Sequence, residues 1–383
     1  MTVARAEAVM AISEIGQAAW DACNVGDHPF TSYAFLSALE DAGCVGGKTG
    51  WTPLHLVARG ADDAVLGVAP AYLKTHSYGE YVFDWAWADA YVRAGGRYYP
   101  KLQLAVPFTP VTGPRLMTGE GADAPAVRRA LAGAAVGLCE QINASSVHVT
   151  FPTPGEADML GGLGFLQRQD RQFWWANRGY ATFDDFLADL SSNRRKTIRR
   201  ERRDAGQELE IVRLTGSDLK EEHWDAFWSF YTDTGARKWG TPYLNRRFFS
   251  LLGERMADRL LLVMARRGSE WIAGALNVIG PDALYGRNWG ALEDVPFLHF
   301  ELCYYQAIEA AIEMGLPRVE AGAQGEHKLA RGYLPQPVYS AHFIADERLR
   351  DPIARYLAQE RPAVAEEMAY LEAEGSPFRN AAG

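Results

Sequence analysis

The chain has 383 residues, of which 48% are hydrophobic and 23% charged, and its formal net charge is −9. This composition excludes an intrinsically disordered protein, and the length exceeds what one hydrophobic core usually holds, so we expect two domains. We expect no signal peptide, transmembrane helix, disulfide framework or metal site, because no long apolar run occurs, the cysteines are scattered and the histidines follow no metal-ligand spacing.

The first half of the chain predicts one α/β domain. A proline precedes an amphipathic helix at 28–40, and two strands joined by a charged turn follow at 55–73. The aromatic stretch at 81–91, YVFDWAWADAY, alternates with period two and predicts a third strand. A long amphipathic helix at 124–143 then leads to a short strand at 145–151.

The second half of the chain repeats this order. It predicts a helix at 241–254, a hairpin at 261–279, an aromatic strand at 283–294, a long helix at 297–315 and a short strand at 318–323. Chance similarity between hairpins explains one match but not five in the same order, so we infer two similar domains in tandem.

We place the first domain at 1–180 and the second at 181–383, the latter with a basic helix at 193–203 and a helical C-terminal tail. The predicted class is α/β (α+β), with a mixed sheet flanked by helices in each domain. The order helix, hairpin, strand, helix, strand is that of the GNAT acetyltransferase fold. In that fold two adjacent parallel strands splay apart and an acyl thioester lies between them.

Three stretches resemble the FemAB-like branch of tandem GNAT proteins. They are NRGYATFDDFLADLSSNRRKTIRRERR, GRNWGALED and FLHFELCYYQAIEAAIEMGLPRVEAGAQGEHKLARGY. The resemblance covers most of the chain and implies an aminoacyl or acyl transferase related to peptidoglycan. The same branch is also similar to bacterial ceramide synthases, which N-acylate a sphingoid base. The chain departs from acetyltransferases where their glycine-rich pyrophosphate loop would stand, because that place reads GALEDVPFLHFE.

The basic stretch NRRKTIRRERR at 193–203 is unusual in an acidic chain, because seven of its eleven residues are Arg or Lys and one is Glu. As a helix it would turn Ile198 toward the core, and its crowded like charges indicate a bound anion. Guanidinium groups match phosphate oxygens, so we expect this helix to replace the missing glycine loop or to hold the cytoplasmic leaflet. A solvated helix neutralised by nearby carboxylates is the alternative. The predicted phosphate-binding residues are Arg195, Lys196, Arg199 and Arg200.

The stretch GAQGEHKLARGY at 322–333 follows the last predicted strand of the second domain. Its glycines let the backbone approach a ligand, and an imidazole accepts a proton from an amine near neutral pH. We therefore predict His327 as a catalytic base, with Glu326 and Glu320 orienting it or acting through water. Lys328 is predicted to contact the substrate. The alternative is a structural loop that caps a helix.

Aromatic and charged residues alternate in both predicted aromatic strands, so we expect Tyr285, Arg287 and Trp289 to share one face of the second strand. Such a face suits an amphipathic acceptor with its polar head on Asp or Arg and its chain on Trp. The predicted acceptor-binding residues are Asp84, Trp85, Trp87, Asp89, Arg287, Trp289 and, at the start of the long helix, His299. We expect them to line a groove between the domains. The alternatives are an interdomain packing face and, for His299, a structural histidine.

These features predict an N-acyltransferase that joins a long-chain acyl-CoA to an amphipathic amine such as a sphingoid base. We expect acyl-CoA as co-substrate, no tightly bound cofactor, and a cytoplasmic protein that contacts the anionic inner-membrane surface. One alternative is an aminoacyl-tRNA-dependent transferase that builds peptidoglycan cross-bridges, the only case in which a nucleic acid partner is expected. The other is a non-enzymatic module that binds anionic lipid.

Overall fold

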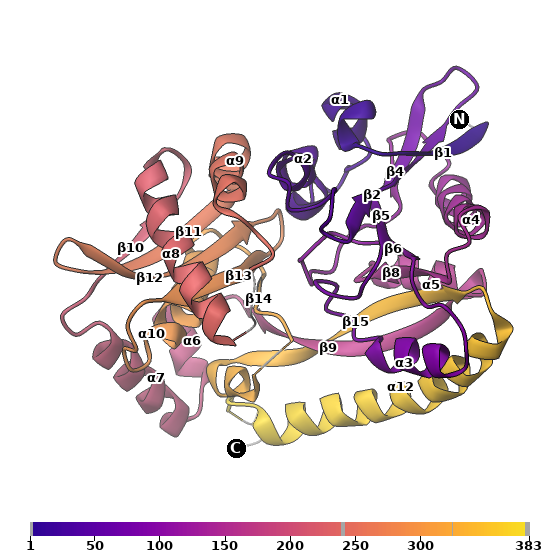
Figure 1. The fold of residues 1–383 in the computed structure, drawn as a ribbon. Helices are drawn as coiled ribbons and strands as arrows, with labels where there is room; N and C mark the ends of the chain where they lie inside the picture. The colour runs from indigo at the N-terminus through magenta and orange to yellow at the C-terminus, as the bar shows by residue number, and fades with distance from the viewer. Residues whose placement is uncertain (1–2, 239–241, 324, 380–383) are drawn as a thin grey trace. The chain divides into compact units, whose positions relative to one another are not determined.

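The chain forms two compact units in the computed structural model (Figure 1). The structure describes residues 3–238, 242–323 and 325–379. Unit 1 comprises Met1–Asp170 and Val338–Val364, and unit 2 comprises Arg171–Pro337 and Ala365–Gly383. Unit 1 is therefore discontinuous in sequence, and the domain boundary at residue 180 stays a prediction. None of the described helices is both long and apolar enough to cross a membrane.

Unit 1 contains two sheets. The smaller is antiparallel in the order β1-β3-β4-β7, and its β3–β4 pair is the predicted first hairpin. The larger has the order β15-β8-β6-β5-β2, in which β6 is parallel to β8. The strands are β1 (Arg5–Val9), β2 (Trp51–Pro53), β3 (His55–Arg59), β4 (Val65–Ala69), β5 (Ala71–Lys74), β6 (Lys101–Leu104), β7 (Met117–Thr118), β8 (Ser146–Thr150) and β15 (Tyr333–Ile344).

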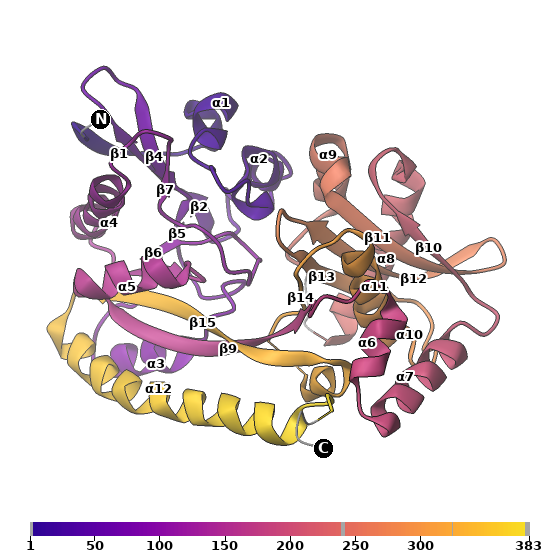
Figure 2. The same ribbon diagram turned by 180° about the vertical axis from the view of Figure 1, so that it is seen from behind.

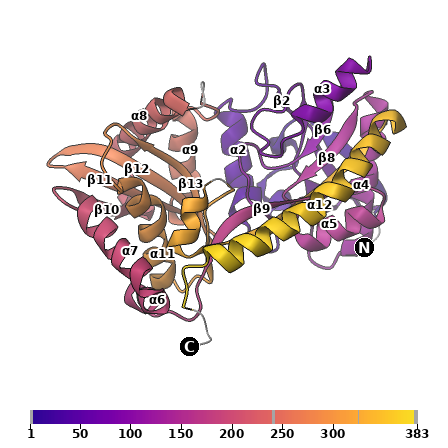
Figure 3. The same cartoon turned by 90° about the horizontal axis from the view of Figure 1, so that it is seen from below.

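The helices of unit 1 bury apolar stripes against these sheets. Helix α4 begins where the Asp123 side chain accepts a hydrogen bond from the Ala126 N–H, and Val127, Leu131 and Ala135 then face the core. The helices are η1 (Ile12–Glu14), α1 (Gln17–Asp21), η2 (Pro29–Thr31), α2 (Tyr33–Asp41), α3 (Trp85–Arg93), α4 (Ala124–Gln141), α5 (Pro154–Gly162) and α12 (Glu347–Gly375). Figure 3 shows α3 beside the first half of α12, which continues into unit 2.

Unit 2 is built on the strand order β10-β11-β12-β13-β14-β9, in which only the β13–β14 pair is parallel among these described strands. The β11–β12 pair is the predicted second hairpin. The strands are β9 (Leu166–Ala176), β10 (Glu210–Leu214), β11 (Leu260–Arg267), β12 (Glu270–Ile279), β13 (Leu284–Ala291) and β14 (Arg318–Glu320).

Helices cover both faces of the unit 2 sheet. Helices α8 and α9 lie on one face (Figure 1), and α6, α7 and α11 lie on the other (Figure 2), where the main core of the unit forms. The helices are α6 (Phe183–Asp189), α7 (Ser192–Ala205), η3 (Gly216–Asp218), α8 (Glu221–Lys238), α9 (Arg246–Met256), η4 (Ala257–Arg259), α10 (Leu298–Phe300), the π-helical turn η5 (Glu301–Tyr305), α11 (Gln306–Glu313) and η6 (Glu326–Arg331).

The predicted strand at 81–91 is wrong, because Trp85–Arg93 forms helix α3. Its aromatic residues alternate, but Trp87, Ala88 and Tyr91 also satisfy helical spacing and pack on α12. The strand of unit 1 that corresponds to β13 is β6 instead. Strand β6 lies parallel to β8, just as β13 lies parallel to β14. The other predicted elements of both halves are present.

Strand β13 contains a β-bulge that changes which face its side chains occupy. Tyr285 pairs with Val278, whereas Trp289 pairs with Ala275, so four steps along β13 match only three along β12. Because side chains alternate, the extra residue turns Trp289 to the face opposite Tyr285. The prediction that these two residues and Arg287 share one face is therefore wrong.

Candidate active site

A sharp loop joins β14 to η6 in unit 2. Gly322 and Gly325 both have positive φ, at 75° and 100°, which other residues rarely adopt. A Cβ atom at Gly325 would also collide with the ring of His327. These two constraints explain the glycines of the predicted motif, and they bring His327 close to the end of the strand. The side chain of Glu326, a predicted catalytic residue, lies outside the described part of the structure.

His327 is half-exposed and is held by a tyrosine. Its Nε2 atom lies 2.9 Å from the hydroxyl of Tyr304 on the π-helical turn η5. Burial raises the pKa of Tyr304, so this hydroxyl stays protonated, and it can accept a hydrogen bond from Nε2–H, which leaves the lone pair of the neutral ring on Nδ1. Partial burial, followed by the charges of Arg331 and Lys328, lowers the pKa of His327 below its ordinary value of 6.5. The imidazole is therefore neutral at physiological pH.

A buried ion pair supports this arrangement from α7. Arg331 Nη2 donates to both carboxylate oxygens of Glu201 at 2.8 Å, and the Tyr305 hydroxyl donates to the same carboxylate. Glu201 is the single acidic residue of the basic stretch, and it is buried. The basic helix thus fixes η5 and η6 together through the one side chain that breaks its charge pattern.

Lys328 closes the loop rather than facing solvent. Its Nζ atom donates to the carbonyl oxygens of Ala321 at 2.5 Å and Gly322 at 3.1 Å, and the side chain is buried. Burial lowers its pKa to about 8. In this position Lys328 stabilises the end of β14, although the sequence predicted a substrate contact.

Aromatic rings gather around His327. The ring centroid of His299 lies 6.0 Å from that of His327 and 5.2 Å from that of Trp289. The Phe300 ring lies 5.5 Å from His327, with the guanidinium carbon of Arg331 3.4 Å above it. The structure therefore brings three predicted site residues together, and the β13 bulge makes this possible because it turns Trp289 to this face.

Glu320 does not join this group. It pairs with Tyr285 and Trp174 across the sheet, so its side chain lies on the face opposite the core that contains Tyr304. Its Oε1 atom accepts a hydrogen bond from Arg318 at 2.9 Å, and Oε2 is buried without a partner among the described residues. Burial raises the pKa of Glu320 to about 7 despite Arg318. Arg287 lies in the bulge between the two faces.

The basic helix α7 forms as predicted, with Ile198 buried. Its charges are partly neutralised, because Arg202 pairs with Glu301 and Glu309, and Arg199 pairs with Asp184 at 3.2 Å. The predicted phosphate-binding residues Arg195, Lys196 and Arg200 form no ion pair with any described residue. They leave a positive surface on the same unit as His327.

In unit 1, the predicted acceptor residues fall on α3. Asp84 is buried at the start of the helix, where it accepts hydrogen bonds from Lys101 and from the Tyr98 hydroxyl. Trp87 is also buried and packs edge-on against the ring of His342 at 4.9 Å. Asp84 and Trp87 are therefore parts of the core, whereas Trp85 and Asp89 are exposed.

Sequence reasoning missed the buried polar network around Asp84. Lys101 Nζ also donates to Glu80 at 2.7 Å, and Glu80 lies 3.7 Å from Lys74. All four of these charged side chains are buried: Lys74, Glu80, Asp84 and Lys101. Burial opposes the charge of Lys101, but Glu80 and Asp84 outweigh burial and raise its pKa. The sequence offers no signal for this network, because Lys101 lies in a short strand far from both carboxylates.

A second missed feature joins β8 to β15. His148 faces His342 across the antiparallel pair, and their Nδ1 atoms lie 2.6 Å apart. The Nε2 atoms of the two rings bond the hydroxyls of Ser146 at 2.7 Å and Ser340 at 2.9 Å. The signal was available, because Ser-x-His occurs in both segments. Burial and the charge of Lys101 lower the pKa of His148 to about 3, so this pair is neutral.

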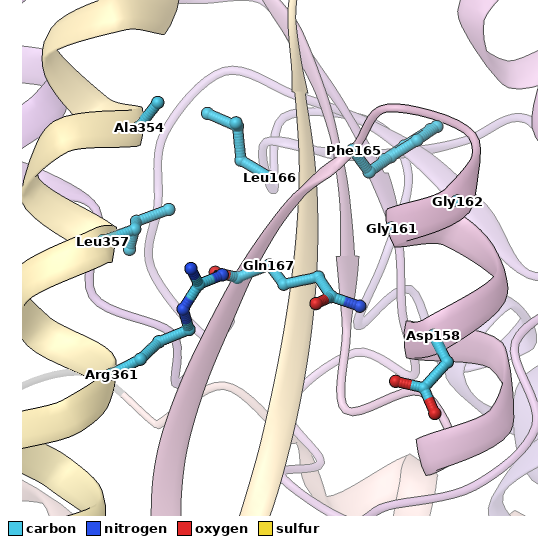
Figure 4. A pocket seen from close by; sticks show the side chains of 9 residues that line it. All are labelled: Asp158, Gly161, Gly162, Phe165, Leu166, Gln167, Ala354, Leu357 and Arg361. Atoms are coloured by element: carbon cyan, nitrogen blue, oxygen red, sulfur yellow. The ribbon is translucent and has the colours of Figure 1, made fainter.

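Unit 1 also holds a cavity of about 440 Å³ beside α5, β9 and α12 (Figure 4). Arg361 in its wall donates to the carbonyl oxygen of Gln167 at 3.1 Å. Its lining residues are Asp158, Gly161, Gly162, Phe165, Leu166, Gln167, Ala354, Leu357 and Arg361. None of the predicted site residues lines it. Within the described residues, no group of His, Cys, Asp and Glu side chains could hold a metal ion.

Comparisons with known proteins agree on the family and the fold. The FemAB-like family, described as peptidoglycan biosynthesis and recognition, matches residues 11–380. FemX is similar in structure, with a TM-score of 0.55, 12% identity, and coverage of 88% of this chain and 98% of FemX. No curated protein sequence matches the chain.

Two further solved structures are similar. The C-terminal domain of a putative lysylphosphatidylglycerol synthetase from Agrobacterium fabrum has a TM-score of 0.52 and 9% identity, and covers 94% of this chain and 99% of that one. A tandem GNAT protein from the clavulanic acid biosynthesis pathway has a TM-score of 0.48 and 12% identity, with coverage of 89% and 98%. The match to the family and the likeness to FemX confirm the predicted fold, an α/β chain of FemAB-like proteins.

Proposed function

Because the chain belongs to the FemAB-like family, we propose that it is an N-acyltransferase that forms an amide between an activated acyl group and the amine of an amphipathic acceptor. Family membership supports the coarser assignment, an acyl or aminoacyl transferase. One observation carries the proposal within the structure: a half-exposed imidazole, His327, with its Nε2 2.9 Å from the Tyr304 hydroxyl and its pKa below the ordinary value.

The chemistry of amide formation calls for such a group. An acceptor amine is protonated near neutral pH and must lose a proton before its nitrogen attacks the carbonyl carbon of the acyl donor. A neutral imidazole accepts this proton and passes it to solvent, and the second proton, which the nitrogen loses after its attack, leaves with the departing thiol or hydroxyl group. Tyr304 orients the ring, and partial burial together with the charge of Arg331 keeps it neutral before the amine binds.

The aromatic surroundings support an amphipathic acceptor. Trp289, His299 and Phe300 lie around His327 and offer apolar area for an alkyl chain. The similar structure from Agrobacterium fabrum is named for a lipid product, lysylphosphatidylglycerol. We propose a long-chain acyl-CoA as the donor, with its phosphates on Arg195, Lys196 and Arg200, and a sphingoid-like amine as the acceptor.

A second candidate is an aminoacyl-tRNA-dependent transferase that extends peptidoglycan precursors. The family description, which names peptidoglycan biosynthesis, favours it. The positive surface of α7 suits the phosphates of tRNA as well as those of a CoA ester. Both candidates use the same base and the same amide chemistry, and they differ in the carrier of the acyl group and in the acceptor amine.

The experiment compares the two carriers with the same protein. Purified protein is incubated with palmitoyl-CoA and sphinganine, or with aminoacyl-tRNA and a peptidoglycan precursor, and the amide product is measured by mass spectrometry. We expect an N-acyl product from the first mixture that ribonuclease does not abolish. A product only from the second mixture, abolished by ribonuclease, would replace the first candidate by the second. Absence of product from both would overturn catalysis and favour a binding module.

A further inference from the structure

We propose that unit 1 docks onto an anionic lipid bilayer through a surface formed by segment 78–92, which we call the aromatic surface. Large apolar side chains are normally buried, yet this short segment exposes five of them. They are Tyr78 at 57% exposure, Tyr81 at 41%, Phe83 at 59%, Trp85 at 38% and Val92 at 60%. The proposal goes beyond the acyl transfer proposed for unit 2 and does not depend on it.

Helix α3 divides its residues between an inner and an outer face. Trp87, Ala88 and Tyr91 pack on the first half of α12, all within unit 1. Trp85 and Val92 lie seven residues apart on the adjoining face, next to Ala88, and are exposed. The helix therefore buries one group of apolar side chains and exposes another. A helix that faces only water usually carries polar residues at such exposed positions.

The segment before α3 is held rigidly although its side chains are exposed. The carbonyl oxygen of Tyr78 accepts hydrogen bonds from Trp51 Nε1 at 3.1 Å and Lys74 Nζ at 3.2 Å. The carbonyl oxygen of Phe83 accepts one from Arg168 Nη1 at 2.7 Å. The buried Lys101 side chain also holds the segment, because it donates hydrogen bonds to the carboxylates of Glu80 and Asp84. Exposed rings on a fixed backbone lose little entropy on binding, unlike rings on a loose loop.

The charges of the segment suit an anionic surface. Both acidic residues between Tyr78 and Trp85, Glu80 and Asp84, point inward to Lys101 and leave no negative charge among the exposed rings. Beyond Trp85, the exposed charges are Asp89, Arg93 and Arg97, which are net positive. Aromatic rings bind at the headgroup level of a bilayer, and flanking arginines attract anionic lipid. This combination favours a bilayer over a protein partner.

The first test removes apolar area from the aromatic surface. The variant Phe83→Ser with Val92→Ser is compared with wild-type protein in sedimentation with phosphatidylcholine vesicles that contain phosphatidylglycerol. Burial of a large apolar side chain changes a partition coefficient roughly tenfold or more, so we expect at least tenfold weaker binding by the double variant. The matched control is Met10→Ser with Leu163→Ser, which removes exposed apolar side chains elsewhere in unit 1, and we expect wild-type binding.

The second test separates the charges. Arg93→Gln with Arg97→Gln should weaken binding to the phosphatidylglycerol vesicles and make it less dependent on salt, with no change on vesicles of phosphatidylcholine alone. Equal vesicle binding by wild-type protein and Phe83→Ser with Val92→Ser would overturn the proposal. So would binding that disappears only when Arg195 and Arg200 are neutralised. Wild-type self-association that depends on Phe83, without vesicle binding, would make the surface an interface between copies of the chain.

Discussion

Units 1 and 2 each place polar side chains beside a pair of parallel strands, but the two groups differ in exposure. Beside β6 and β8 of unit 1, Lys101 and His148 are fully buried and every charge has an opposite charge nearby. After β14 of unit 2, His327 is half-exposed and its neighbours Arg331 and Lys328 carry the same positive charge. The buried and paired groups of unit 1 are held rigidly. The half-exposed imidazole of His327 is kept neutral by partial burial and by the nearby positive charges.

This difference is the reason why the proposed base is His327 and not His148. A group that must exchange a proton with substrate needs access to it, and of the two histidines His327 is half-exposed whereas His148 is buried. The unit 1 network, with the pKa of His148 near 3, cannot accept a proton at neutral pH. Substitutions in the two units should therefore have opposite signatures, one in turnover and the other in stability.

The largest effect is expected for His327→Ala. Loss of a positioned general base lowers turnover by roughly 10²–10⁴, about 3–5 kcal/mol of activation free energy, and should leave the melting temperature almost unchanged because the side chain is half-exposed. Steady-state kinetics beside a melting curve measure both. Turnover within about threefold of wild type would remove His327 from the mechanism, and a large fall in melting temperature would assign it a structural role.

The pH profile of the wild-type enzyme sharpens the same point. Because the pKa of His327 lies below 6.5, the base is already neutral at pH 7, and turnover should fall only as the pH drops below that value. Tyr304→Phe removes the hydrogen bond to Nε2 and should lower turnover roughly tenfold, within the range of one lost hydrogen bond to a catalytic group. A profile that rises only above pH 8 would point to a lysine instead of His327.

The converse substitution in unit 1 is Lys101→Met. It leaves the carboxylates of Glu80 and Asp84 buried without their main partner, and loss of one member of a buried ion pair costs about 3–5 kcal/mol of unfolding free energy. Urea unfolding measures the loss. Lys48→Met, at an exposed position of the same unit, is the control and should change stability little. If both variants unfold at the same urea concentration, the network does not stabilise unit 1.

A smaller effect concerns Glu320 and pH. Its pKa is about 7 in the folded chain, above the ordinary value of 4.5, so the folded state binds more protons between these two pH values. The stability from this group is complete below pH 4.5 and is lost as the pH rises through 7. Glu320→Gln should remove a fall in unfolding free energy on the order of 3 kcal/mol across that window.

Glu80 acts in the same direction, because burial raises its pKa to about 7, so part of the fall should remain in Glu320→Gln. Urea unfolding at several pH values measures the slope. The exposed Glu366→Gln variant is the matched control and should follow the wild-type curve. Superimposable slopes for wild type and Glu320→Gln would show that Arg318 keeps this carboxylate ionised throughout.

The smallest effect on stability is expected at α7. Exposed charges contribute about 0–1 kcal/mol, so Arg195→Ala with Arg200→Ala should leave the unfolding free energy nearly unchanged. The same variant should bind palmitoyl-CoA more weakly and with a shallower salt dependence, because two phosphate contacts are lost. Arg129→Ala with Arg355→Ala, two exposed arginines of unit 1, is the control. Identical salt slopes for both variants would exclude α7 as the donor site.

The sequence predicted most of the fold, because each half repeats a helix, a hairpin, a long helix and a short strand with clear periodicity. It failed at 81–91, where alternating aromatics fit a strand and a helix equally well and packing on α12 decided between them. It also failed at Trp289, because a single extra residue in β13 reverses the side-chain faces without any signal in the sequence.

The candidate site was predicted in part. The residue types and the motif named His327, Trp289 and His299, and the structure brings the three together, while their roles stay predictions. The support from Glu201 was missed, since a lone acidic residue in a basic stretch does not indicate which distant arginine it will pair with. Lys101 was missed for the same reason, because contacts between distant segments follow from tertiary packing alone.

The discontinuity of unit 1 has a consequence for how the chain is made. Strand β15 pairs with β8 through residues 340–344, yet all of Arg171–Pro337 is synthesised between them. At the usual rate of translation that interval lasts roughly 10–30 s, during which the edge of β8 has no partner strand and His148 has no His342. The ribosome therefore releases unit 1 as a complete domain only after the sequence of unit 2 has already emerged.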